Sequence, residues 1–123
     1  MDEIRITLPS VPTVNKLYFN CHGRRAMTSQ GKKWKAEVMT WANLQKIRQH
    51  WKLIEREKVV MEVTNFWPDN RKRDSSNTLK ILEDSFTGIL YDDDRWVLPR
   101  IMDFHVDRDN PRCEVRIYKH NEN

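Results

Sequence analysis

The chain has 123 residues, of which 38% are hydrophobic and 33% charged, a size and composition that predict one folded domain and exclude two separate cores. Lysine and arginine (22) exceed aspartate and glutamate (18), a modest basic excess that permits nucleic acid as a partner. Two cysteines and an N-terminus without an apolar targeting run exclude a disulfide scaffold and a signal segment. We therefore expect a single cytoplasmic domain over residues 1–123, with no membrane partner.

The first half of the chain is predicted to contain a strand, a loop and a long helix. Residues 4–8 alternate apolar and polar side chains, which indicates a half-buried strand ended by Pro9. Residues 10–22 are expected to form a loop, because prolines and polar residues interrupt any regular pattern. A helix is predicted over residues 30–49, capped by Thr28 or Ser29 and with a buried stripe at Trp34, Val38, Trp41 and Leu44.

The second half adds three strands and a shorter helix. Residues 59–67 are rich in β-branched side chains and stop at Pro68, which predicts a strand. An amphipathic helical pattern then runs to Phe86, and strands are expected at 96–106 and 112–118, joined by a turn. Pro99 indicates that its strand starts late, carries a bulge or lies at a sheet edge. These elements predict an α+β domain with a mixed sheet of about four or five strands and two main helices.

Charged residues concentrate between residues 71 and 94. A basic triplet ends at Arg73, Asp74 precedes the helix, and three aspartates follow it at 92–94. On a helical wheel Asn77, Lys80 and Asp84 share one side, opposite the apolar face. Carboxylates among cations are what a divalent ion and a phosphate backbone both require. The segment therefore predicts a magnesium-dependent site for phosphodiester chemistry.

Each of these features also has an ordinary structural explanation. Asp74 is as well placed to cap the first helical turn as to bind a cation. Lys80 is spaced to pair with Asp84 on the helix surface, and three adjacent aspartates are often a solvated turn. The metal-site interpretation requires the acidic turn to lie opposite Asp74, where magnesium would relieve the repulsion between the carboxylates.

The order of these residues resembles the RusA family of Holliday junction resolvases, found in prophages and bacteriophages. The resemblance spans nearly the whole chain. At the N-terminus it covers Ile6-Thr7-Leu8-Pro9, Pro12 and Asn15-Lys16, which are similar to the family's first strand and proline-rich loop. The most specific match is Arg73-Asp74-x-x-Asn77-x-x-Lys80-x-x-x-Asp84, followed by Asp92-Asp93.

The resemblance implies a function and a set of site residues. It implies a homodimeric, magnesium-dependent endonuclease without an organic cofactor, which nicks two symmetry-related strands of a four-way DNA junction in recombination and repair. Asp74 and Asp93 would be metal ligands, Asp92 a supporting carboxylate and Lys80 a catalytic cation. Asn77 and Asp84 match positions that support the site. The DNA backbone is expected to contact a polar and basic set, Asn15, Lys16, Arg71, Lys72 and Arg73.

One position departs from the family pattern. Ser76 stands where the pattern carries a second aspartate two residues after the first. A hydroxyl binds magnesium more weakly than a carboxylate, so the site is one negative charge short. Either another aspartate compensates, or Ser76 holds a metal-bound water, or the protein binds junctions with weak or no cleavage. A basic structural protein whose aspartates only solubilise a turn is a third reading, which binding without preference for branched DNA would support.

Overall fold

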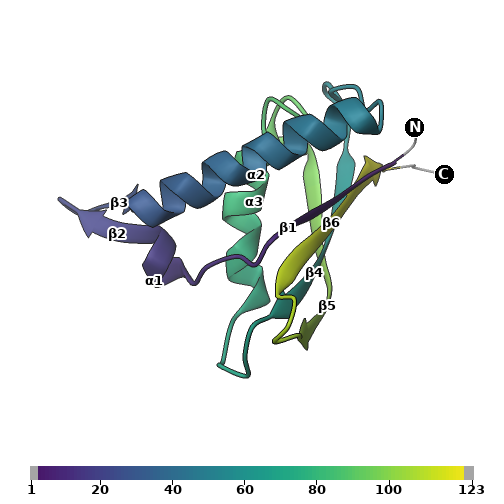
Figure 1. Ribbon diagram of the computed structural model, residues 1–123. Coiled ribbons are helices and arrows are strands. Elements are labelled where there is room, and N and C mark those ends of the chain that lie inside the picture. The colour runs from purple at the N-terminus through teal and green to yellow at the C-terminus, as the bar shows by residue number, and fades with distance from the viewer. Residues whose placement is uncertain (1–2, 121–123) are drawn as a thin grey trace.

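A four-stranded mixed sheet forms one layer of the protein in a computed structural model that describes residues 3–120 (Figure 1). The strand order is β1-β6-β4-β5. β6 pairs antiparallel with β1 and β4, whereas β4 and β5 run parallel. The prediction of an α+β domain with a mixed sheet of four or five strands is therefore confirmed. The strand bounds are Glu3–Pro9 (β1), Val59–Trp67 (β4), Val97–Val106 (β5) and Arg112–Lys119 (β6).

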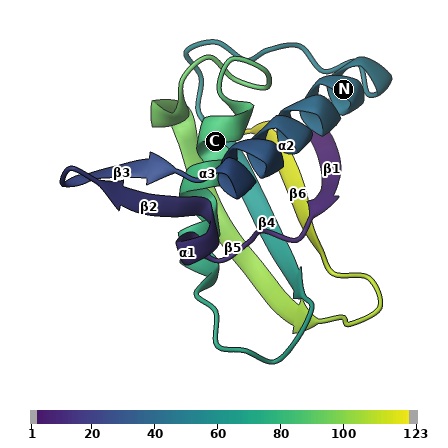
Figure 2. The same ribbon diagram turned by 60° about the vertical axis from the view of Figure 1, so that its left-hand side comes forward.

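Helices cover one face of this sheet. α2 (Ser29–Arg48) crosses above β1 and α3, and α3 (Leu79–Phe86) continues from the 3₁₀ turn η1 (Ser75–Thr78) (Figures 1 and 2). α2 begins as expected, because the Thr28 hydroxyl oxygen accepts a hydrogen bond of 2.9 Å from the Gly31 amide. Among residues 3–120, no helix is long and apolar enough to cross a bilayer.

The opposite face of the sheet is polar. Arg116 on β6 bonds Glu3 on β1 and Glu62 on β4, and Glu62 also accepts a 2.7 Å hydrogen bond from the Tyr118 hydroxyl. These contacts hold the pKa of both carboxyl groups below its ordinary value, through the Arg116 bond for Glu3 and the Tyr118 bond for Glu62. This face explains the alternation of apolar and polar residues from which the first strand was predicted.

The expectation of a loop over residues 10–22 is wrong. This segment contains the short helix α1 (Val14–Leu17) and the strand β2 (Tyr18–Cys21), which pairs with β3 (Arg24–Met27) in a hairpin that projects from the main sheet (Figure 2). The two turn residues, His22 and Gly23, have φ of 50° and 77°, as a tight hairpin turn requires. A glycine after a polar residue was the available signal.

Two smaller predictions also need correction. Trp41 was placed in the core stripe of the long helix, but it is 38% exposed, because it lies at the margin of the buried face made by Trp34, Val38 and Ala42. Asn77 lies in η1 rather than in the helix itself. The last two strands, β5 and β6, do not pair with each other, since β4 lies between them. Pro99 does lie on an edge strand, β5, which also carries a bulge near Ile101.

Candidate nucleic-acid and metal site

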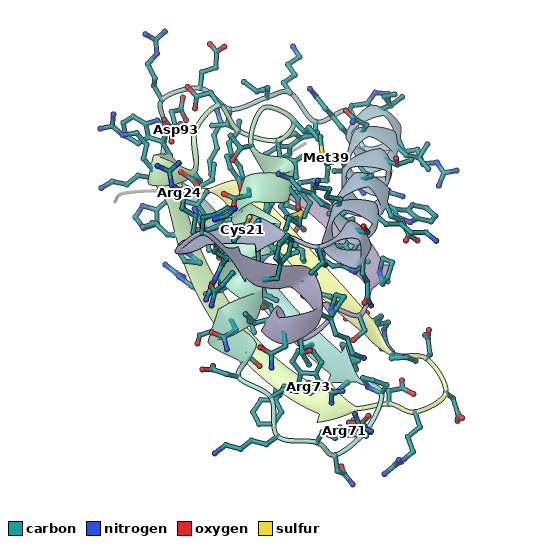
Figure 3. The ribbon with its side chains drawn as sticks, turned by 90° about the vertical axis from the view of Figure 1, so that its left-hand side faces the viewer. Cys21, Arg24, Met39, Arg71, Arg73 and Asp93 are labelled. Carbon is teal, nitrogen blue, oxygen red and sulfur yellow. The ribbon has the colours of Figure 1, made fainter. Side chains whose placement is uncertain are left out.

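The predicted site residues lie at two ends of one β4–α3–β5 unit. Asp74 follows β4, and Asp92 to Asp94 precede β5. Because β4 and β5 are parallel neighbours, the last residue of β4 and the first residue of β5 lie at opposite ends of the two strands. Figure 1 shows η1 at the lower end of α3 and the turn before β5 at the upper end. Figure 3 shows the same separation between Arg73 and Asp93.

Asp74 caps η1. Its Oδ1 accepts hydrogen bonds from the Ser76 hydroxyl at 2.6 Å and the Ser76 amide at 3.0 Å. These two bonds, the hydroxyl bond first, lower the pKa of Asp74 below its ordinary value. The side chain remains exposed. Asp74 is therefore ionised at neutral pH and accessible to a ligand, although one oxygen is already engaged.

Asp69 holds Arg73, the basic residue directly before Asp74, in place. The Arg73 guanidinium donates to Asp69 Oδ1 at 2.7 Å and to the Asp69 carbonyl at 3.3 Å, and it stacks over the Trp67 ring at 5.2 Å. Only 12% of the Arg73 side chain is exposed. Lys72 and Arg71 are exposed. Arg73 is thus a structural anchor for the segment, and its neighbours are the cations available to a phosphate.

A groove runs between this segment and the N-terminal part of the chain. It brings together three predicted regions, namely Asn15 in α1, the last two residues of the basic triplet, and η1 with its cap Asp74. On its other side a second depression joins Asp74 and Asn77 to Ile101 and Phe104 of β5. The first groove is lined by Val11, Pro12, Thr13, Val14, Asn15, Trp67, Lys72, Arg73, Asp74, Asn77 and Thr78. Neither Lys16 nor Arg71 lines it, and both are exposed.

Lys80 lies between the two ends. Its Nζ is 3.2 Å from Asp84 Oδ1 and 3.6 Å from Asp94 Oδ2, and 71% of the side chain is exposed. Asp84, through a hydrogen bond, is the main cause that raises the pKa of Lys80, and Asp94 adds to it. Nearby Glu83 has a raised pKa because it is partly desolvated. The ordinary explanation of Lys80 as an ion-pair partner is observed, with Asp94 as an additional partner that the helical spacing did not show.

The acidic turn is held by backbone amides. Asp92 Oδ1 accepts from the Arg56 amide at 3.3 Å, and Asp93 Oδ1 accepts from the Arg95 amide at 2.9 Å, capping the 3₁₀ turn η2 (Asp94–Trp96). Asp92 and Asp93 are exposed. Buried Leu90 and Tyr91 precede the run and anchor it to the core. The turn is therefore ordered, and its outer carboxylate oxygens face solvent.

Within one chain the proposed carboxylates do not fit a shared magnesium ion. η1 and α3 lie between the two ends along the chain, whereas the ligands of one magnesium ion all lie about 2 Å from it. Over residues 3–120, no three His, Cys, Asp or Glu side chains form a group that could hold a metal. The expectation that the acidic turn lies opposite Asp74 is not met within the described chain, because parallel β4 and β5 place the two segments at opposite ends of the strands.

Two residues of this region were missed from the sequence. Asp69 fixes Arg73, and Trp67 supplies the ring beneath it. The four-residue spacing between Asp69 and Arg73 was a visible signal, although it is uninformative outside a helix. Trp67 was read only as the end of a strand.

One comparison with known proteins identifies a family for this chain. A family described as endodeoxyribonuclease RusA matches residues 8–118. The match covers every candidate residue, from Asn15 to Asp94. A search of the curated proteins finds no significant match.

Proposed function

Since the chain belongs to the RusA endodeoxyribonuclease family, we propose that it is a magnesium-dependent endonuclease that resolves four-way DNA junctions by paired symmetric nicks. The observation that carries this proposal is the groove in which an exposed carboxylate, Asp74, lies beside Lys72 and Asn77. A phosphate backbone requires cations along its path, and a metal that activates phosphodiester cleavage requires a carboxylate next to that path.

The proposed roles follow the charges of the side chains. Asp74 and Asp93 would bind the metal, with Asp92 in support, and the ion would neutralise charge on the phosphate oxygens. Lys80 would stabilise negative charge on the phosphate in the transition state. Asp84 and Asn77 would position these groups. The DNA backbone would be held by Asn15, Lys72 and Arg73, which line the groove, and by the exposed Lys16 and Arg71 outside it.

The proposal is tested with a synthetic four-way junction and a linear duplex of the same sequence. We expect cleavage of the junction in magnesium, none in chelator, and little cleavage of the duplex. Binding to the junction should persist in chelator and weaken steeply with salt, because it depends on released counterions. Absence of cleavage in magnesium, with Asp74→Asn indistinguishable from wild type, would end the enzymatic proposal.

A junction-binding protein with little turnover is the second candidate. It is favoured by the bond from the Ser76 hydroxyl to Asp74 Oδ1, at 2.6 Å. That bond occupies Oδ1 of Asp74, the exposed carboxylate in the groove. Ser76 itself stands where the family pattern has a further acid. This candidate predicts tight, salt-sensitive junction binding that survives chelation, without nicks at any magnesium concentration.

Ser76→Asp separates the two candidates. A second carboxylate beside Asp74 should raise affinity for magnesium by about tenfold or more, because affinity follows the number of charged ligands. We expect cleavage of the junction to rise in parallel. Calorimetric titration with magnesium measures the first effect, and the initial rate of nicking measures the second.

The matched control is Ser75→Asp, which adds the same charge one residue away on a partly buried position. It should change magnesium affinity much less than Ser76→Asp. If Ser76→Asp instead weakens both metal binding and cleavage, the hydroxyl is itself part of a differently built site.

A further inference from the structure

The hairpin of β2 and β3 is a part of the fold that the proposed groove and metal residues do not use. It projects from the main sheet, with His22 and Gly23 at its tip (Figure 2). We infer that this hairpin enters the open centre of a four-way junction, where Phe19 stacks on a base that has lost a stacking neighbour. The inference rests on the proposed function, because that function makes branched DNA the substrate.

The positive charge of the chain is concentrated around the hairpin. Residues 4–36 contain seven lysines and arginines and no aspartate or glutamate. The rest of the chain therefore has 15 lysines and arginines against all 18 acidic residues. Arg24 and Arg25 on β3 are exposed, and Figure 3 shows Arg24 on the hairpin beside Cys21, its partner in the strand pairing. This region supplies the whole basic excess of the protein and attracts a polyanion.

Phe19 lies on the outer face of this basic hairpin. Its neighbour Tyr18 packs against the core, and successive side chains of a strand point to opposite faces, so Phe19 points away from the core. It is 49% exposed. The residue opposite it on β3 is Ala26, whose side chain is too small to cover an aromatic ring. Phe19 therefore presents a ring that is available to a flat ligand.

The hairpin continues directly from the groove. α1 lines the groove through Asn15 and ends directly before β2. Tyr18, the first residue of β2, has the Arg25 guanidinium over its ring at 5.4 Å. Burial raises the pKa of Tyr18, and the negative charge of Asp84 on α3 raises it further. The base of the hairpin thus lies beside the groove and within electrostatic reach of the helix that carries Lys80.

Stacking on Phe19 would distinguish a junction from a linear duplex. Lysine and arginine contacts to phosphates carry no such information, because both DNAs have the same backbone. In a duplex every base is stacked between two neighbours, whereas bases at the centre of an open junction have lost one of them. An aromatic ring on a cationic surface replaces that neighbour, as it does in proteins that bind single strands. The groove would provide affinity, and Phe19 would provide selectivity for the branch.

Phe19→Ala tests this role through binding alone, in chelator. Fluorescence anisotropy with a labelled four-way junction and with a linear duplex of the same sequence gives both affinities. We expect the affinity for the junction to fall about tenfold, because a stacked base is lost, and the affinity for the duplex to stay unchanged. Phe19→Trp should bind the junction as wild type does. Ile47→Ala, which removes a 73% exposed apolar side chain from α2, is the matched control and should change neither affinity.

The base analogue 2-aminopurine, placed at each position next to the branch point, reports stacking directly. Wild type should change its fluorescence at one or more of these positions, and Phe19→Ala should leave it as in the free junction. The same analogue in the middle of an arm should respond to neither protein. If wild type changes the fluorescence at no branch position, the inference is overturned.

Arg24→Gln tests whether the hairpin contacts the DNA backbone. It should weaken binding to the junction and the duplex by the same factor and reduce the salt dependence by about one ion. Arg48→Gln removes the same charge from an exposed position at the other end of α2 and should have little effect. Identical behaviour of the two variants would mean that the hairpin lies away from the DNA.

The outcomes separate this inference from the proposed function. Circular dichroism verifies that each variant folds. If Phe19→Ala binds the junction as tightly as wild type, or loses affinity equally for both DNAs, Phe19 does not read the branch and the inference fails. Cleavage enters none of these measurements. A wild type that selects junctions through Phe19 but makes no nicks in magnesium would overturn the enzymatic proposal alone.

Discussion

Asp74→Asn should abolish junction cleavage while leaving junction binding intact. The rate should fall roughly a thousandfold or more, because metal-assisted charge stabilisation contributes several kcal/mol and about 1.4 kcal/mol corresponds to a factor of ten. Asparagine keeps an oxygen that can accept the Ser76 hydrogen bonds but has no negative charge. The cap of η1 therefore persists, and the loss concerns the chemistry. Single-turnover cleavage of a labelled junction measures the rate.

Asp109→Asn is the control for this substitution. Asp109 is an exposed carboxylate in the turn that joins β5 to β6, at the same end of the sheet as Asp74. Its removal changes the net charge equally and should leave cleavage unchanged. Binding by Asp74→Asn should be equal to or tighter than wild type, because one repulsive charge beside the DNA backbone is gone. Weakened binding with normal cleavage would show that Asp74 acts only on DNA affinity.

Phe86→Ala should lower the free energy of unfolding by about 3–5 kcal/mol. Phe86 is fully buried at the end of α3, among the residues that join the helix layer to the sheet. Truncation leaves a cavity that the surrounding strands cannot close. A loss of this size is a large part of the 5–15 kcal/mol typical of a domain. Urea unfolding at fixed protein concentration, followed by circular dichroism and by tryptophan fluorescence, gives the change.

The same experiment tests whether residues 1–123 form one domain, which we propose because a single hydrophobic core contains residues from both halves of the chain, such as Ile4 and Phe86. The two optical signals should follow one transition. Ile47→Ala removes an exposed apolar side chain from α2 and should change stability by less than about 0.5 kcal/mol. Two separate transitions would contradict a single cooperative unit.

Most of the fold was predictable because one face of the sheet is buried and the other faces solvent. Alternation in β1 and β6 follows directly from that arrangement, and the run of buried side chains in β4 follows from its central place. Of the three possibilities that Pro99 indicated, a sheet edge and a bulge are both observed in β5. The order of the strands could not be predicted from the hydrophobic pattern, because it depends on which segments pair across the sheet.

The hairpin was missed because its strands have no apolar alternation. β2 and β3 are four residues each, and most of their side chains are exposed. The hairpin is held where it meets the rest of the protein. A Cβ on Gly31 would lie 2.5 Å from the Leu17 carbonyl oxygen and 2.8 Å from Met27 Cγ, so the hairpin base packs directly on the first turn of α2. Such contacts are between segments and leave no local signal.

The site shows a different limit of sequence reasoning. The residues around Asp74 were predictable as a group, because Lys72, Asp74 and Asn77 are close in the chain and line the same groove. The position of Asp93 was not, because its distance from Asp74 depends on whether β4 and β5 are parallel. Their parallel pairing places the two carboxylates at opposite ends of the strands. A pattern of spacings contains the candidate ligands of a site, but not the distances between them.

The most direct test of the proposed function is a map of the nicks in a four-way junction, with each of its strands labelled in turn. The proposed function predicts cuts in two opposing strands at symmetry-related positions, at equal rates and only with magnesium. Cuts confined to one strand, or at unrelated positions in wild-type reactions, would contradict the proposed resolution by paired symmetric nicks.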